Sequence, residues 1–367
     1  MKILQGGYTT GACVAAGVKA VMILWSKNIF VESVEITALD GTLLTIPIKL
    51  LEVISDVEVK AEVIKYSGDD PDITNGASIF TYVKRIEGTE IIFKAGLGVG
   101  TITKPGLALP VGEPAINKGP RQLIRNVVDE FYKNAGLEIT ISIPAGVELA
   151  KKTLNPVLGV KGGLSVIGTT GVLRPMSEEA FKKSLIPQID VAQASGFKTL
   201  VFVPGKIGAE SAIKIGIPQG AIVETSNFIG YMLENAAARK INQILLFGHL
   251  GKLAKVAGGV FYTHNRIADG RMETIAAYAA AAGLNQSGVK KILESNTTEE
   301  AMKIIEDNKL DSVYKVLAER ASIRAQRYVF NEMTIGTAII DLEGRILGID
   351  TNAEKIIPSL ITCLKDR

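Results

Sequence analysis

The feature that most constrains the fold is an alternation of short apolar runs with helical patterns in the second half of the chain. The apolar runs are typical of buried strands and lie at Leu164–Ile167, Thr199–Val203, Ala221–Val223 and Gln243–Phe247. The helical patterns between them cover Glu178–Ser195, Ala209–Ile215 and Asn227–Lys240. Strands and helices at these intervals favour βαβ units, whose right-handed crossovers build a parallel sheet. We therefore expect residues 157–367 to form an α/β, Rossmann-like domain with a mainly parallel sheet.

The first part of the chain has a different pattern. Ser33–Ile48 is typical of a hairpin, because two β-rich runs meet at Asp40 and Gly41, a preferred pair for a tight turn. Further alternating runs predict an α+β domain over residues 1–156 with a mainly antiparallel sheet. A long loop rich in glycine and proline, residues 101–124, is uncommon in a compact domain unless it lines a site, so we expect these loops to face a substrate.

Composition excludes several classes of protein. With 367 residues, of which 47% are apolar and 22% charged, the chain is long enough for two globular domains. The net charge of +3 and the lack of a dense basic block predict no nucleic-acid binding. No run reaches the roughly 18 uninterrupted apolar residues of a membrane span. Cys13 and Cys363 stand near opposite ends without paired spacing, which predicts a cytoplasmic protein without a disulfide framework. A homo-oligomer is compatible with the sequence, which leaves the oligomeric state open.

The stretch Gly162–Pro175 is where we expect a cofactor. After the predicted strand, Gly168 and Gly171 bracket Thr169 and Thr170, and a helix is expected to begin after Ser177. Free amides of such a loop, and of a helix N-terminus, attract anionic groups. No third glycine completes a GxGxxG motif, so an ordinary strand-to-helix turn explains this stretch equally well.

Two polar stretches near the N-terminus admit two interpretations each. The threonines at the start of the first helix, in QGGYTTGACVAAG, suit an anion site, but a capping threonine is the favoured interpretation. The segment SGDDPDITNGA carries Asp69, Asp70 and Asp72, which could bind Mg²⁺ or substrate groups. Aspartate and asparagine also make turns, and the turn interpretation is favoured there.

The parallel strands should bring four polar turns, GTTG, VPGK, VETSN and FGHLGK, to one edge of the sheet. Glu224 is the acid best placed there for ribose hydroxyls. The end of the second predicted strand reads Val203-Pro204-Gly205, so a standard NAD interpretation lacks its acid. The only histidines, His249 and His264, have no carboxylate or cysteine at metal-ligand spacing, which predicts no protein-bound metal. The motifs GxSxG, GxxxxGK[ST] and HExxH are absent, which argues against common hydrolase, P-loop and zincin mechanisms.

Five long stretches resemble the CbiD family of cobalamin biosynthesis, the cobalt-precorrin-5B C(1)-methyltransferases. They are GYTTGAC from Gly7, GDDPDITNGA from Gly68, GVGTITKPGLALPVGEPAINKGPR from Gly98, LAKKTLNPVLGVKGGLSVIGTTGVLRPMSEEA from Leu149, and LLFGHLGKLAKVAGGVFYTHNRIADGR from Leu245. The resemblance implies methyl transfer from S-adenosylmethionine to carbon 1 of a cobalt-corrinoid precursor, which yields cobalt-precorrin-6A on the anaerobic branch. It also implies that cobalt arrives with the substrate.

For that reaction we expect three sets of residues to act. The proposed cofactor-binding set consists of Gly168, Thr169, Thr170, Gly171, Gly205, Glu224, Asn227 and Gly248. The set expected to receive the macrocycle and its carboxylate arms consists of Tyr8, Thr9, Thr10, Lys104, Arg121, Lys252, Arg266 and Arg271. His249, His264 or Asp70 could serve as a base.

Two other functions remain open. A nicotinamide-dependent oxidoreductase could use the same sheet edge, although the acid missing after the second predicted strand counts against it. A non-catalytic corrinoid carrier is the other alternative, and the cofactor-type loop counts against that one.

Overall fold

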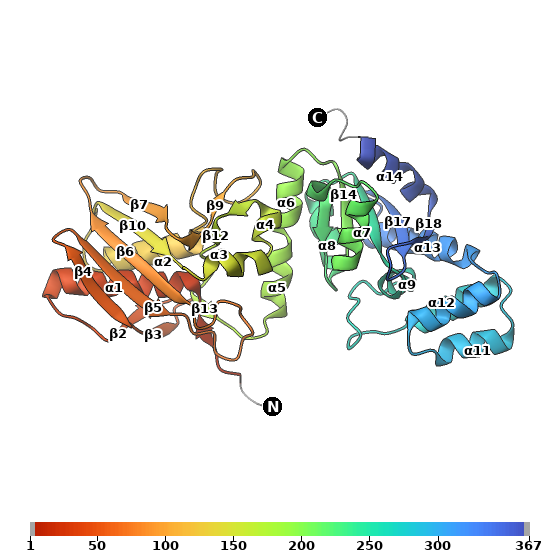
Figure 1. Ribbon diagram of the computed structural model, residues 1–367, viewed down its shortest axis with the longest axis horizontal. Coiled ribbons are helices and arrows are strands. Elements are labelled where there is room, and N and C mark those ends of the chain that lie inside the picture. The colour runs from red at the N-terminus through yellow and green to blue at the C-terminus, as the bar shows by residue number, and fades with distance from the viewer. Residues whose placement is uncertain (1–3, 363–367) are drawn as a thin grey trace. The chain divides into compact units, whose positions relative to one another are not determined.

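The computed structural model describes residues 4–362 and contains two compact units, Met1–Glu178 and Glu179–Arg367. Figure 1 draws the first unit in red to yellow and the second in green to blue. The sequence predicted the boundary at residue 156. Residues 157–178 belong instead to the first unit, because their three short strands pair with strands of that unit. The protein is thus a mixed α/β molecule with several sheets.

A five-stranded sheet forms the frame of the first unit. Its strands, in spatial order, are β4 (Leu50–Ser55), β5 (Glu58–Ile64), β6 (Ser78–Arg85), β10 (Leu137–Ser142) and β7 (Ile91–Ala95). Neighbours pair antiparallel except for β10 and β7, which are parallel. This pairing agrees with the mainly antiparallel sheet expected for the N-terminal part.

Two helices pack on this sheet. Helix α1 (Thr10–Lys27) lies against β5 and β6, and α2 (Lys118–Asp129) packs beside it. Small residues allow this close approach, because a Cβ on Gly17 would lie 3.0 Å from Thr81 Oγ1 of β6. Cys13 is buried in α1, and burial raises the pKa of its thiol to about 12. Cys363 lies outside the described residues.

Short strands tie the loops of the first unit together. The hairpin predicted over Ser33–Ile48 is confirmed as β2 (Ser33–Thr37) and β3 (Leu43–Pro47). The remaining pairs are β1 (Gly7–Tyr8) with β13 (Val172–Leu173), β9 (Thr101–Ile102) with β11 (Val160–Lys161), and β8 (Gly98–Val99) with β12 (Gly163–Leu164). The short helices are α3 (Gly146–Leu149), a 3₁₀ turn at Ala150–Lys152 and α4 (Asn155–Leu158).

The strand predicted at Leu164–Ile167 is wrong. Only Leu164 is in a strand, β12, and this strand pairs with β8 and not with the sheet of the second unit. The next amides donate elsewhere: Val166 N to Ala115 O at 2.8 Å, and Ile167 N to Thr10 Oγ1 at 2.9 Å. An apolar run alone therefore did not identify the backbone partners that decide strand membership.

The second unit is built on another five-stranded sheet. Its spatial order is β15 (Ile222–Glu224), β14 (Thr199–Val203), β16 (Gln243–His249), β17 (Thr334–Ile340) and β18 (Ile346–Ile349). The first four strands are parallel and β18 is antiparallel, so the C-terminal hairpin joins this sheet. The predicted strands at residues 199–203, 221–223 and 243–247 are confirmed within a residue or two.

Helices precede, connect and follow the strands of the second sheet. They are α5 (Glu178–Leu185), α6 (Pro187–Ala194), α7 (Lys206–Lys214), α8 (Ile229–Ala238), α9 (Leu250–Ala257), α10 (Arg271–Ala281), α11 (Gln286–Glu294), α12 (Thr298–Asp307), α13 (Ser312–Tyr328) and α14 (Thr351–Thr362), with a 3₁₀ turn at Gln219–Ala221. Apolar residues of α7 and α14 share one core with the sheet, while α9 and α13 pack on each other and on β17. The helix predicted over residues 178–195 is two helices, divided before Pro187, whose ring cannot continue a helix interior. No helix within residues 4–362 has the length and apolarity needed to cross a bilayer.

A pair of glycines tests how much the first unit depends on close backbone packing. A Cβ on Gly68 (φ +61°) would lie 2.1 Å from Gln5 O, whereas one on Gly76 (φ +77°) would meet nothing within 4 Å. We expect Gly76→Ala to lower the free energy of unfolding by about 1 kcal/mol, and Gly68→Ala by roughly 3 kcal/mol, because the clash adds to the left-handed strain. Urea unfolding followed by the fluorescence of Trp25, the single tryptophan, measures both; equal losses would contradict the packing argument.

Candidate functional site

The carboxyl ends of the parallel strands in the second unit bring together several predicted site residues. Strand β15 follows β14 in sequence on one side, whereas β16 joins β14 on the other side, so the winding direction reverses between β14 and β16. Ligands of open α/β sheets bind at such a switch point. Gly205, Glu224 and His249 lie at these strand ends, so the turns VPGK, VETSN and FGHLGK share one edge as predicted. The turn GTTG belongs to the first unit and not to this edge.

Glu224 presents a free carboxylate at this edge. Its main chain is fixed by Gln188, whose Oε1 accepts from Glu224 N at 2.9 Å and whose Nε2 donates to Glu224 O at 3.1 Å. Within the described part of the chain, the carboxylate itself has no hydrogen-bond or ion-pair partner. On the neighbouring strand end, Gly205 precedes α7, and a Cβ there would meet nothing within 4 Å. The edge therefore combines open backbone with an unpaired acid.

The order of the strands corrects one sequence argument. Because the first strand of this sheet is β14, Glu224 ends the second strand, not the third. The end of the second strand is where nucleotide-binding sheets place the acid that contacts ribose hydroxyls. The acid that the sequence analysis found missing is thus present.

Asn227 and Lys252 form the next part of the site. The Lys252 ammonium donates to Asn227 Oδ1, and the carbonyl of Asn227 accepts from Thr263 N at 2.9 Å. Burial lowers the pKa of Lys252, and the positive charges of Lys255 and Arg271 lower it further. An anion that binds beside Lys252 would offset this repulsion and stabilise the charged form of the lysine.

His249 sits where β16 ends and α9 begins. Its Nδ1 accepts from Gly251 N at 3.2 Å and so caps α9. Its Nε2 lies 3.1 Å from Glu299 Oε1, without the alignment of a hydrogen bond. Burial lowers the pKa of His249 below 6.5, against the opposing effect of the Glu299 carboxylate. A neutral imidazole at this edge can accept a proton.

A buried lysine orders the loop that follows α9, residues 258–270. Lys255 Nζ donates to Thr263 O at 3.3 Å, Asn265 Oδ1 at 2.6 Å and Ala268 O at 3.0 Å, and it lies 3.4 Å from Asp269 Oδ1. Sequence reasoning missed this residue. The available signal was a lysine on the apolar face of a short helix, in LAKVA.

The loop carries His264 and Arg266, and Arg271 begins α10 directly after it. His264 Nδ1 accepts from Arg266 N at 3.2 Å, and the Arg266 residue is exposed. Arg271 Nε lies 3.5 Å from Asp269 Oδ1, and its guanidinium donates to Asn296 O at 3.3 Å. Arg266 is therefore more available to a ligand than Arg271.

In the first unit, the motifs GYTTG and GTTG pack against each other. Thr9 caps α1 by accepting from Ala12 N at 3.2 Å, and its own amide donates to Gly171 O at 2.9 Å. Thr10 Oγ1 donates to Ile167 O at 3.0 Å. The capping interpretation is thus confirmed for Thr9. A Cβ on Gly168 would lie 2.2 Å from Thr9 Oγ1, so this glycine has a packing role. The helix expected after Ser177 is confirmed as α5, but no strand covers Leu164–Ile167 before the loop, and β13 separates the loop from the helix. The predicted strand–loop–helix context of Gly168–Gly171 is therefore not formed. That context is what had suggested a cofactor loop, and ligand binding by these residues stays a prediction.

Of the aspartates of GDDPDITNGA, Asp72 holds a turn, whereas Asp69 and Asp70 accept from amides distant in sequence. Asp70 Oδ2 accepts from Met176 N at 2.9 Å, and Asp69 Oδ2 accepts from Gln5 N at 2.8 Å. Asp72 accepts from Thr74 through Oδ1 and from Lys65 Nζ through Oδ2 at 3.1 Å. Burial alone would raise the pKa of Asp72, but these hydrogen bonds and the Lys65 charge lower it. Residues 4–362 contain no group of three or more histidine, cysteine or acidic residues that could hold a metal ion.

The two cations predicted in the glycine- and proline-rich loops are engaged by the chain itself. Lys104 Nζ donates to Val157 O at 3.1 Å. Arg121 donates to Ile116 O and to Glu113 Oε2, both at 2.8 Å. Neither side chain is poised for a ligand in this structure.

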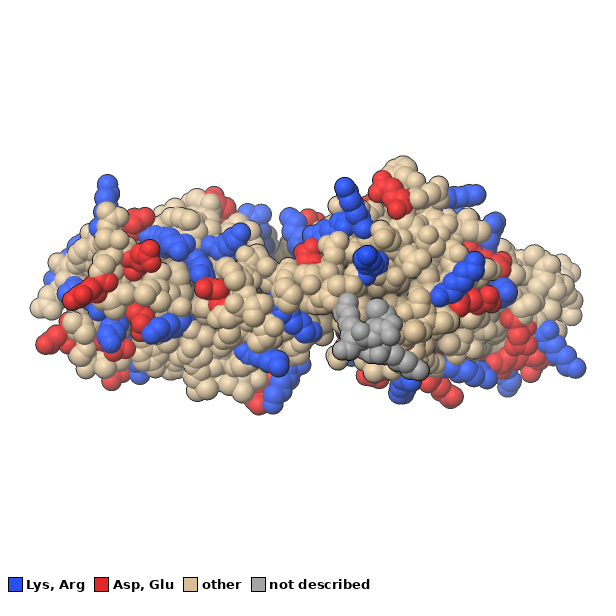
Figure 2. Space-filling view, turned by 90° about the horizontal axis from the view of Figure 1, so that it is seen from above, with Lys and Arg blue, Asp and Glu red and all other residues tan. Residues whose placement is uncertain are grey.

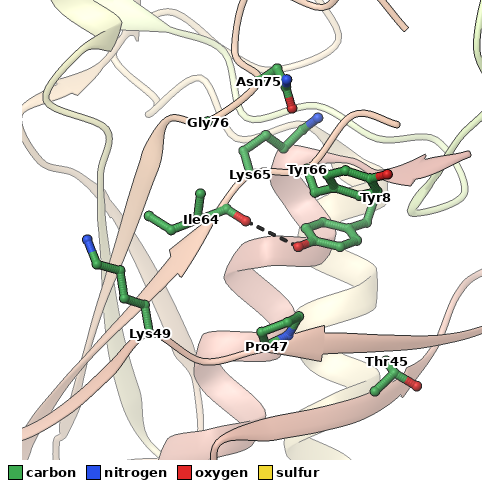
Figure 3. A pocket seen from close by; sticks show the side chains of 9 residues that line it. All are labelled: Tyr8, Thr45, Pro47, Lys49, Ile64, Lys65, Tyr66, Asn75 and Gly76. Carbon is green, nitrogen blue, oxygen red and sulfur yellow. Dashed lines mark hydrogen bonds between the residues drawn. The ribbon is translucent and has the colours of Figure 1, made fainter. Parts of the chain in front are cut away.

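A cavity of about 550 Å³ opens beside the start of α1. Figure 3 shows Lys49 at one end and Tyr8, Tyr66 and Asn75 at the other. The hydroxyl of Tyr8 donates to Ile64 O at 3.2 Å, and the two tyrosine ring centroids are 6.1 Å apart. Of the predicted substrate residues in this unit, Tyr8 is the one that lines the cavity.

Comparisons with known proteins agree on one family. The model described as CbiD matches residues 1–175, and the model described as CbiD, C-terminal domain, matches residues 262–351. The cobalt-precorrin-5B C(1)-methyltransferase of Moorella thermoacetica is 46% identical over 357 residues, or 96% of this chain and 97% of that protein. The protein of the same name from Methanocaldococcus jannaschii is 46% identical over 93% of this chain and 95% of its own. A crystal structure of a cobalamin biosynthesis protein (cbiD) from Archaeoglobus fulgidus is 26% identical over 72% of this chain and 83% of its own, with a TM-score of 0.38, too low to support a fold argument.

The two histidines allow a direct test of the environment of His249. We expect proton NMR to give His249 a pKa below 6.5, and Glu299→Gln to lower this pKa further, because the carboxylate opposes the effect of burial. The unfolded chain then binds more protons below pH 6.5, so stability falls as the pH decreases from there to the folded pKa. His264→Gln assigns the signals. A His249 pKa above 6.5, or an increase in Glu299→Gln, would contradict this electrostatic description.

Proposed function

The chain belongs to the CbiD family, and from this membership we propose that it methylates carbon 1 of cobalt-precorrin-5B to give cobalt-precorrin-6A. The observation that carries the proposal is the 46% identity to a curated relative of that name over nearly the full length of both chains. The acceptor would be a cobalt corrinoid, whose cobalt is part of the substrate.

We propose S-adenosylmethionine as the methyl donor, bound at the sheet edge of a Rossmann-like second unit. The edge fits such a ligand, because Glu224 offers an unpaired carboxylate for the ribose hydroxyls and the amides that open α7 after Gly205 suit the methionyl carboxylate. Asn227 and Gly248 lie along the same turns. When bound, the donor supplies a sulfonium methyl group.

The reaction asks the protein mainly for positioning. An electron-rich ring carbon attacks the methyl group that sulfur carries. A carbon–carbon bond forms, the carbon–sulfur bond breaks, and the sulfonium becomes a thioether. Holding the two reactants in line and excluding water can account for most of the acceleration. We assign the acceptance of any proton released by the ring to His249 and not to His264 or Asp70. Of the three, His249 ends β16 at the edge proposed for the donor, whereas His264 lies in the loop after α9 and Asp70 belongs to the first unit. A proton taken up at His249 Nδ1 would replace the contact with Gly251 N.

Individual cations, and not a general field, would recognise the acid arms of the macrocycle. Figure 2 shows basic and acidic side chains interspersed on the visible face of each unit, in line with a net charge of +3. In the second unit, we propose Lys252 and the exposed Arg266 for this role, with Arg271 beside them.

One observation keeps an oxidoreductase as the second candidate. Glu224 at the end of the second strand would suit the ribose of a nicotinamide cofactor as well. The names of the curated relatives favour methyl transfer. A carrier without chemistry would need no acid at this edge.

The role of Glu224 can be tested by calorimetry. We expect the full chain to bind S-adenosylhomocysteine and not NADH, and Glu224→Gln to weaken this binding about tenfold or more, because a charged acceptor is lost. Glu294→Gln, which changes an exposed acid of α11, is the control and should leave the affinity unchanged. Binding of NADH alone would support the oxidoreductase, and binding of neither ligand the carrier.

A further inference from the structure

The cavity of the first unit has no part in the donor site proposed above. It lies where two stretches distant in sequence meet, GYTTG through Tyr8 and GDDPDITNGA through Asn75. Its volume of about 550 Å³ is within the range of small-molecule sites in proteins. A second binding surface is needed in any enzyme that brings two large ligands together, so this cavity is a candidate for the other ligand.

The wall of the cavity is rigid. Lys65 is buried and donates to Ser67 Oγ at 2.7 Å and to Asp72 Oδ2 at 3.1 Å, which ties down the loop that carries Asn75. Asn75 Oδ1 in turn accepts from Ser67 N at 3.0 Å. A wall held in this way loses little conformational entropy when a ligand binds.

Some polar groups on the cavity wall make hydrogen bonds within the protein, and others do not. Within residues 4–362, Thr45 Oγ1, Tyr66 Oη and Asn75 Nδ2 make no hydrogen bond to the protein. Tyr8, by contrast, is largely buried and its hydroxyl already donates to Ile64 O, so the ring open to a ligand is that of Tyr66, which is 40% exposed. The exposed Tyr66 ring with free donors beside it suits a flat conjugated group with polar substituents.

A cation stands at the opposite end of the cavity. Lys49 is about half exposed and lies 2.9 Å from Glu62 Oε1, which also accepts from Ser78 Oγ at 2.7 Å. If Lys49 turns to a ligand carboxylate, Glu62 keeps the hydrogen bond from Ser78. The cavity thus offers an aromatic end and a cationic end (Figure 3).

We propose that this cavity binds one edge of the corrinoid, with a pyrrole-derived ring against Tyr66 and an acid arm on Lys49. The inference rests on the proposed function, since it assigns the acceptor of that reaction to a place. It adds Lys49, Thr45, Tyr66 and Asn75 to the residues that contact substrate.

The experiment uses the full chain and two stable cobalt corrinoids as probes, cobyrinic acid with free acid arms and cobinamide with amidated arms. Equilibrium dialysis followed by visible absorbance measures affinity. We expect wild type to prefer cobyrinic acid, and Lys49→Gln to weaken that binding about tenfold through loss of a charge-assisted hydrogen bond. Tyr66→Leu should weaken both probes. The control is Lys60→Gln, which breaks another lysine–glutamate ion pair, with Glu52 at 3.0 Å, outside the cavity.

The outcomes separate this inference from the proposed function. Unchanged affinity for cobyrinic acid in both Lys49→Gln and Tyr66→Leu would overturn the inference, as would an equal loss in Lys60→Gln. Affinity for S-adenosylhomocysteine should stay the same in all three variants, and Trp25 fluorescence verifies that each one folds. A wild type that binds cobyrinic acid with the expected variant pattern but does not bind S-adenosylhomocysteine would support the cavity assignment while refuting the proposed donor.

Discussion

Within residues 4–362, each unit buries one lysine and uses it to hold a polar loop in place. Taking an ammonium group out of water costs several kcal/mol unless acceptors surround it. Lys255 meets this condition with three acceptors and a nearby carboxylate, all from the loop over residues 258–270. Lys65 meets it with Ser67 and Asp72. The loops that carry His264 and Asn75 are therefore held in place by the buried ammonium groups of Lys255 and Lys65. In turn, these loops supply the acceptors that each ammonium group needs.

Contacts between main-chain atoms hold chain segments together around the start of α1. At Gly7 and Gly68, an added Cβ would lie within 2.5 Å of Tyr66 O and Gln5 O respectively. The chain segments that precede α1 and follow β5 thus touch main chain to main chain. This packing explains why so many glycines and short polar residues gather in these motifs: they bring segments together, and the cavity with its tyrosines lies beside that junction.

The sequence predicted what local chemistry decides and missed what distant partners decide. The hairpin around Asp40, the strand at Thr199–Val203 and the capping role of Thr9 follow from turn residues, β-branched runs and a threonine before a helix. Arg121 and Lys104 could not be judged in this way, because their acceptors lie on backbone and side-chain groups that only the fold brings near. Lys65 and Lys255 were missed for the same reason.

Two predictions depend on which strand begins the parallel sheet of the second unit. Counting Leu164–Ile167 as the first strand of the parallel sheet put the cofactor at the GTTG turn and left the second strand without an acid. The sheet begins instead with β14. The GTTG turn therefore does not belong to this sheet and packs against Thr9, and Glu224 lies at the end of the second strand, where nucleotide-binding sheets place an acid. The expectation of an acid at the end of the second strand agrees with the structure, whereas the inclusion of Leu164–Ile167 among the strands of this sheet is wrong. Since the free carboxylate and the open backbone at Gly205 lie at the ends of two adjacent parallel strands, the case for a nucleotide-like ligand is stronger without the loop that first suggested it.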